Sequence, residues 1–158
     1  MKMRRGQSIL YVLLLMPTLI LVLSLTIDLG QMQMQRLRLR YAVDLATVSG
    51  ASSVDAAAYS QSGRLRIDRN AALAITRAYL EANLVPALGG REAGTVANAA
   101  DITVINDLPG IDPYTGMRLD RPSVCARINV RYRFNLIGFL GRLGLGHLSV
   151  ASTAEIRP

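Results

Sequence analysis

The chain has 158 residues, of which 51% are hydrophobic and 5% aromatic, and its formal net charge is +7. This length allows one small domain in addition to a membrane segment. The single cysteine, Cys125, excludes an intramolecular disulfide bond, so we expect packing or a partner to stabilise the protein and Cys125 to be a small buried hydrophobe.

The first predicted element is an apolar segment near the amino terminus. Residues 6–27 contain no charged side chain and lie between a basic start (Lys2, Arg4, Arg5) and Asp28. A helix of this length would rise about 33 Å, which is enough to cross a hydrocarbon core of about 30 Å. The alternative is a cleaved secretory signal, but such signals have an apolar region of only about 7–15 residues and end at a small-x-small site. We therefore expect an uncleaved membrane span.

The basic residues predict the orientation of this span. Three of them precede it closely, whereas Arg36, Arg38 and Arg40 lie about two helical turns beyond its other end. The positive-inside rule therefore places the amino terminus in the cytoplasm and residues 30–158 outside it.

One apolar helical face continues beyond Asp28. Apolar residues recur at spacings of three and four, at Met34, Leu37, Tyr41, Leu45 and Val48. This periodicity predicts a single helix of roughly 40 residues, half in the membrane and half protruding, that ends near Ser49. Gly50, Ser52 and Ser53 provide the stop signal.

Five residues of this region are candidates for helix packing and assembly: Asp28, Gly30, Ala42, Asp44 and Ala46. Asp28 is expected at the outer membrane boundary, hydrated or facing a partner's positive charge, and Gly30 would let another backbone approach closely. Asp44 stands among small residues that suit close helix packing. The alternative is that both acids are simply solvated.

The same region resembles the amino-terminal signature of TadE/TadG-like proteins. The resemblance covers about 45 of the 158 residues and rests on Arg5-Gly6-Gln7, Pro17 within the span, Asp28-Leu29-Gly30 and the run from Tyr41 to Ala51. It implies an accessory, pilin-like protein of the tight-adherence (Flp) pilus machinery or a related secretion system. It also implies a single-pass protein of the bacterial inner membrane, whose partners are the membrane and other pilus or secretion subunits, in homo- or hetero-oligomers formed through the helix.

One residue departs from the prepilin pattern. Gly6 and Gln7 mark the place where a prepilin peptidase would cut, but prepilin-like members carry Glu five residues after the glycine, where this chain has Tyr11. The TadG-like branch, which keeps its span as an anchor, fits the chain better.

The rest of the chain predicts helices followed by strands. Residues 56–59 extend or restart the helix until Gly63, and Asp68 is a good N-cap for a helix to about Leu84. The expected buried face of this helix contains Ala71, Ile75, Ala78, Tyr79 and Ala82. Pro86 and Gly89-Gly90 should end the helix, and residues 91–95 read as an exposed loop.

Alternation of apolar and polar residues predicts strands at 102–105, 124–134 and 149–156, with an apolar, glycine-interrupted segment at 136–145 between the last two. The predicted class is α+β: a long amino-terminal transmembrane helix that continues into an extracytoplasmic domain with a second helix and a small antiparallel sheet of about three strands. The expected divisions are a cytoplasmic terminus (1–8), the span (9–27), its protruding continuation (28–52) and the extracytoplasmic domain (53–158).

Candidate chemistry is sparse. In the turn-rich segment 107–120, Asp107, Asp112 and Asp120 could hold Ca²⁺, but their spacing matches no calcium motif and ordinary turn chemistry is favoured. Cys125 and His147 could meet on adjacent strands as nucleophile and base, without any local motif to support such a pair. We expect no catalytic residue, metal site or cofactor.

The basic residues are scattered and are not interleaved with aromatic residues that would stack on bases, so nucleic acid is not an expected partner. A small-molecule substrate is not expected either, because no catalytic set of residues is expected. Three function classes remain: a non-enzymatic assembly component, a membrane-anchored adhesion or binding module, and a surface enzyme. The first is preferred.

Overall fold

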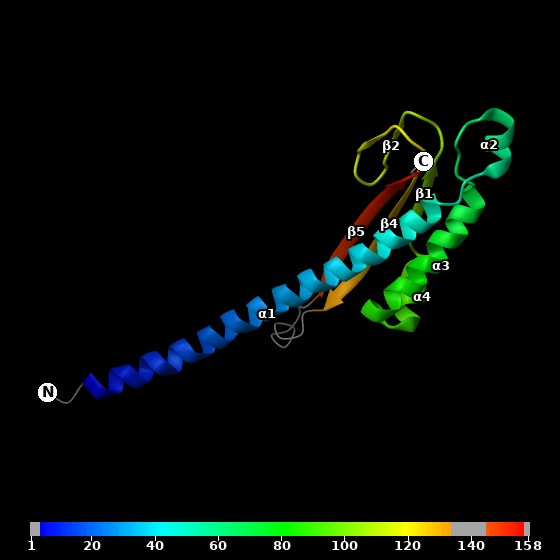
Figure 1. The fold of residues 1–158 in the computed structure, drawn as a ribbon. Coiled ribbons are helices and arrows are strands. Elements are labelled where there is room, and N and C mark those ends of the chain that lie inside the picture. Colours follow the sequence, from blue (N-terminus) through cyan, green and yellow to red (C-terminus); the bar gives the residue numbers. More distant parts are fainter. Residues whose placement is uncertain (1–3, 134–144, 157–158) are drawn as a thin grey trace. The chain divides into compact units, whose positions relative to one another are not determined.

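The structure is a computed structural model that describes residues 4–133 and 145–156 (Figure 1). The helices are α1 (Arg4–Ala51), α2 (Ala56–Ser62), α3 (Arg69–Leu88) and α4 (Gly90–Asn98). The strands are β1 (Asp101–Ile105), β2 (Gly110–Ile111), β3 (Arg118–Leu119), β4 (Ser123–Arg133) and β5 (Leu145–Glu155). The predicted α+β class is confirmed. The apolar segment expected before the last strand lies outside the described residues as far as residue 144.

The chain divides into two compact units. The first unit combines Met1–Met34 with Arg131–Gly146, and the second combines Gln35–Val130 with His147–Pro158. The first unit therefore holds the apolar half of α1. The second unit holds the rest of α1, the three shorter helices and most of the sheet.

In the first unit, α1 is apolar on all sides. Large side chains from Tyr11 to Leu29 are exposed around the whole circumference of the helix. From Tyr11 onward, α1 is the one helix in the described ranges that is long and apolar enough to cross a membrane, by length and composition alone, and an 18-residue stretch of it has a mean hydropathy of 2.4. The predicted long helix is confirmed, and Pro17 lies inside it.

In the second unit, three strands form an antiparallel sheet in the order β1-β4-β5. Thr103 of β1 lies opposite Cys125 of β4 in the register of the first pair. Alternate residues of β4 and β5 are buried, among them Val124, Ala126, Ile128, Val130, Leu148, Val150 and Ala154, and so is Ile156 directly after β5. This alternation gives the sheet one apolar face, as the sequence predicted.

The apolar face of the sheet is covered by helices. The end of α1 and the start of α3 meet the strands in one buried cluster: Ala51, Ile67, Ala72, Val124, Ala154 and Ile156. Ile102 and Val104 of β1 pack against the same cluster. This cluster is the core that holds the carboxyl-terminal part of α1 to its own domain.

Helix α3 begins where the sequence predicted but buries a different face. The Asp68 carboxylate caps it by accepting hydrogen bonds from the backbone N–H of Asn70 (2.9 Å) and Ala71 (3.2 Å). The predicted buried face was wrong, because Ala78 and Tyr79 are exposed whereas every fourth residue is buried: Ala72, Thr76, Leu80 and Leu84. Small and apolar residues surround this helix, so the periodicity alone did not define its inner side. The helix also continues past Pro86 to Leu88.

The expected loop at 91–95 is a helix. These residues lie in α4, which packs against α3 (Figure 1) and buries Ala93 and Ala97 one turn apart. Gly89 stands between the two helices at φ 82°, a backbone conformation that glycine adopts readily, and so lets the chain turn back. Two small residues at a spacing of four carried too little apolar surface to predict this helix.

At Gly50, α1 approaches α3 closely. A Cβ atom on Gly50 would lie 2.0 Å from Oγ1 of Thr76 and 3.3 Å from the carbonyl oxygen of Ala72. The absence of a side chain at Gly50 therefore sets the distance between the two helices.

We predict that Gly50→Ala lowers the free energy of unfolding of the full chain in detergent by about 1–3 kcal/mol, because the added methyl group overlaps Thr76. Gly30→Ala is the matched control, since nothing lies within 4 Å of the corresponding position and the change improves helix propensity. Urea unfolding followed by circular dichroism measures both. Adding Thr76→Ala should restore much of the loss, and equal stability of Gly50→Ala and Gly30→Ala would contradict the contact.

Candidate functional site

The carboxyl-terminal part of α1 has two faces of different character. One face is buried in the chain's own fold and consists mainly of small residues: Leu39, Ala42, Val43, Ala46, Thr47, Gly50 and Ala51. The hydroxyl oxygen of Thr47, on this face, lies 3.3 Å from that of Ser152 on β5. At 100° per residue, the opposite face is centred about half a turn away.

That opposite face is the apolar stripe that the sequence predicted. Four of its five side chains are exposed: Leu37 by 64%, Tyr41 by 65%, Val48 by 60%, and Met34 one turn before Leu37. The fifth, Leu45, is half-buried at the edge of the stripe. The four exposed residues therefore take no part in the core of the second unit.

The structure places the predicted packing residues in three different surroundings. Ala42 and Ala46 are buried inside the second unit, so the close packing that they allow takes place within the chain. Gly30 is exposed, with open space where a side chain would be. Asp44 is half-buried, and its carboxylate lies 4.0 Å from Nε of Arg40 one turn earlier. A role of these residues in assembly stays a prediction.

Asp28 is fully buried at the end of the apolar half of α1, so it is not a solvated surface acid. The hydroxyl of Tyr132, in the same unit, donates a hydrogen bond to the backbone carbonyl of Asp28 at 3.5 Å. Burial, and then the nearby charge of Asp28, raise the pKa of Tyr132 above its usual value. No local pattern predicts that Tyr132, more than a hundred positions later, lies beside Asp28.

Gly6 and Gln7 lie in the first turns of α1. Cleavage between them stays a prediction.

The three acids of the loop at 107–120 serve different partners. The Asp107 carboxylate lies 3.9 Å from the guanidinium of Arg66, and the Asp120 carboxylate lies 3.2 Å from the guanidinium of Arg118. Asp112 is buried. The Asp112 carboxylate accepts hydrogen bonds from backbone N–H groups of Tyr114 and Thr115 and from the hydroxyls of Thr115 and Thr153. Within residues 4–133 and 145–156, no three side chains of the kinds that bind metals converge.

Through these hydrogen bonds, Asp112 holds the loop in its conformation. Burial opposes its charge, but the hydrogen bonds from Thr115, Thr153 and the backbone outweigh burial and lower the pKa of the Asp112 carboxyl below its ordinary value. The bond from Thr153 attaches the loop to β5. Tyr114 adds a second attachment through its hydroxyl, 3.1 Å from that of Thr103 on β1.

Cys125 and His147 do not form a catalytic pair. Cys125 is buried beside Thr153 and Asp112, and burial raises the pKa of its thiol to about 11. His147 is exposed and lies six positions before Thr153 on β5, about 20 Å away along an extended strand. A base must lie within about 3 Å of its nucleophile, so this arrangement leaves Cys125 as a packing residue.

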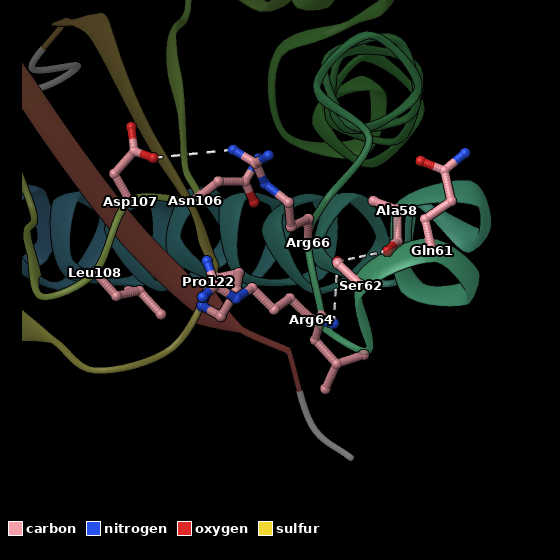
Figure 2. Close-up of a pocket in the computed structure, with 10 residues that line it drawn as sticks. Ala58, Gln61, Ser62, Arg64, Arg66, Asn106, Asp107, Leu108 and Pro122 are labelled. Atoms are coloured by element: carbon pink, nitrogen blue, oxygen red, sulfur yellow. Dashed lines mark hydrogen bonds and ion pairs between the residues drawn. The ribbon is translucent and has the colours of Figure 1, made fainter.

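Figure 2 shows an open cleft of about 840 Å³ in the second unit, between α2 and the start of the 107–120 loop. Arg64, Arg66 and Asp107 line it, together with Asn106. The Asn106 side chain pairs with the backbone of Ile67, because its amide donates to the carbonyl of Ile67 and its oxygen accepts from the N–H of Ile67. No histidine, cysteine or glutamate lines the cleft, and its one carboxylate, that of Asp107, is fully exposed and lies 3.9 Å from the guanidinium of Arg66.

We predict that Asp112→Asn lowers the free energy of unfolding at pH 7 by about 1–3 kcal/mol, because the amide cannot accept all four hydrogen bonds. A carboxyl group whose pKa is lower in the folded state stabilises the protein at pH values above the pKa that it has in the unfolded state, which is about 3.9. The difference between the two proteins should therefore shrink as pH falls through the folded-state pKa of Asp112. Asp120→Asn, at an exposed pair, should change stability by no more than about 0.5 kcal/mol. Equal losses in both variants at pH 7 would contradict the role of Asp112.

Comparison with known proteins gives one match. Residues 6–53 match the model of a family described as putative Flp pilus-assembly TadE/G-like. No curated protein and no solved structure matches the chain. The match spans the apolar half of α1, the buried Asp28 and the whole two-faced segment as far as Gly50. The resemblance seen in the sequence is thereby confirmed: the amino-terminal part of this chain is similar to the TadE/G-like family.

Proposed function

We propose that the protein is a non-enzymatic, pilin-like accessory component of a Tad/Flp-type pilus assembly or related secretion system, anchored in the bacterial inner membrane. The observation that carries this proposal is the overlap between the family match at 6–53 and a helix that is apolar on all sides before Asp28 and packed on one side after Leu39. An assembly protein needs both an anchor and a defined outer domain.

The membrane anchor follows from the exposed surface of α1. Side chains such as Leu14 (71% exposed) and Leu19 (56%) are largely exposed, and water is an unfavourable surrounding for such a continuous apolar surface. A hydrocarbon core accepts the same surface, and the helix satisfies its own backbone hydrogen bonds. The basic residues before the span favour a cytoplasmic amino terminus and an outer domain on the other side.

The proposed partners are other subunits of the same machinery, which contact the protein through α1. Gly30 supports this role because it lies just after the span and is open to the approach of another helix. The buried alanines support it differently: Ala42 and Ala46 hold α1 against its own domain and so fix which side of the helix remains available.

The preference for a non-enzymatic role rests on the family, which is described by pilus assembly, and on the arrangement of the candidate residues. The buried thiol of Cys125, on β4, lies beside Thr153, whereas the exposed imidazole of His147 lies six positions before Thr153 on β5.

We predict that deleting the gene, or cutting the chain after Ile27, abolishes surface assembly, measured as pilus protein sheared from cells. Cys125→Ala and His147→Ala should each retain near wild-type assembly, because neither residue is proposed to perform chemistry. Loss of assembly in either point variant, with the protein still folded and in the membrane, would contradict the proposal. Normal assembly in the deletion strain would reject the pilus role itself.

A further inference from the structure

The exposed stripe of α1 is a helical seam with one acidic position. Leu37, Tyr41, Asp44 and Val48 fall within about 60° of one another around the helix, at 100° per residue. Tyr41 and Val48 are seven residues apart, and Leu37 and Asp44 are also seven apart, which is the repeat of helices that pack along their length. We call these four residues the seam.

Lipid does not account for the seam. With Asp28 at the membrane boundary, as the proposed function has it, Leu37 stands about 13 Å and Val48 about 30 Å farther along the helix. The headgroup layer on each side of a bilayer is only about 5–8 Å thick. Tyr41 and Val48 therefore lie above the lipid, and their exposed apolar surface needs a protein partner.

The seam leads into a cleft of the second unit. Val48 lines this cleft of about 750 Å³ together with the exposed apolar side chains Val54 and Met117, and the charged residues Arg121 and Glu155 also line it. A helix that lies along the seam would therefore end against Val54 and Met117. This continuity gives the contact a defined length, from Leu37 to the cleft.

A second copy of this chain would pair poorly along the seam. Two copies anchored by the same span would pair in parallel and at the same height, which brings the Asp44 carboxylates together in the middle of the contact. Like charges that meet in an interface repel each other. Arg40 lies 4.0 Å from Asp44 and is 70% exposed, so it compensates this charge only weakly.

We propose that the seam binds the helix of a different membrane-anchored subunit, with apolar residues in a seven-residue repeat and a basic side chain at the level of Asp44. This inference rests on the proposed function, because the shared anchor sets the parallel direction and the height of the partner helix. The apolar residues of the seam supply the contact area, and Asp44 selects the partner by charge.

The test uses the full chain in nanodiscs and two synthetic single-span helices that differ at one position. Each probe has a leucine-rich span followed by a helix with apolar seven-residue spacing, and carries either Lys or Glu at the height of Asp44. Binding is measured by fluorescence energy transfer. We expect the Lys probe to bind about tenfold more tightly than the Glu probe, which corresponds to about 1.4 kcal/mol. Asp44→Lys should reverse this order.

The control variants distinguish binding at the seam from nonspecific binding to other exposed side chains. Tyr41→Ser and Leu37→Ser should weaken binding of both probes, whereas Tyr79→Ser, at a tyrosine of α3 that is 51% exposed, should leave it unchanged. All three positions are exposed, so circular dichroism should show an intact fold.

Equal affinity for the Lys and Glu probes, or binding insensitive to Tyr41→Ser, would overturn the inference. Stronger energy transfer between two labelled copies of the chain than with the Lys probe would overturn it in favour of self-association. In these cases a deletion strain that still lacks surface assembly would leave the proposed function standing.

Discussion

The structure depends on one helix that meets two different surroundings. Before Asp28, α1 exposes apolar side chains on every side, and after Leu39 it buries one side against its own sheet. An all-round apolar surface is stable in a hydrocarbon core, whereas a one-sided one is stable at the surface of a folded domain. The buried Asp28, with Tyr132 beside it, stands where the first pattern gives way to the second.

The inner side of α1 explains the small residues of the TadE/G-like segment. Ala42, Ala46 and Gly50 follow one another at a spacing of four and are all buried, and Gly50 is in contact with Thr76 of α3. Small residues let two helices and a sheet meet closely in a domain with few aromatic side chains. Because this side is used within the chain, a partner is left with the opposite side, where the larger residues Leu37, Tyr41 and Val48 are exposed.

The sequence predicted what depends on local pattern. The apolar run, the Asp68 cap and the alternation in β4 and β5 correctly indicated the long helix, the start of α3 and the sheet. Local pattern did not predict contacts between segments that are distant in the sequence. The buried face of α3 was predicted wrongly because the contact of Thr76 with Gly50 of α1, and not the apolar periodicity of α3, places Thr76 on the inner side. Likewise, the spacing of Asp107, Asp112 and Asp120 did not reveal that Asp112 alone would be buried beneath hydroxyls from two segments.

The central claim is that α1 lies in lipid before Asp28 and, from Leu39 onward, presents only one side to solvent. A membrane-impermeant maleimide added to intact cells tests this directly on single cysteine substitutions along α1, because the native Cys125 is buried and its pKa is raised to about 11. Without other subunits, we predict labelling of Leu37→Cys, Tyr41→Cys and Val48→Cys, but not of Leu15→Cys or Ala46→Cys. Uniform labelling after residue 36, or any labelling at position 15, would contradict the claim.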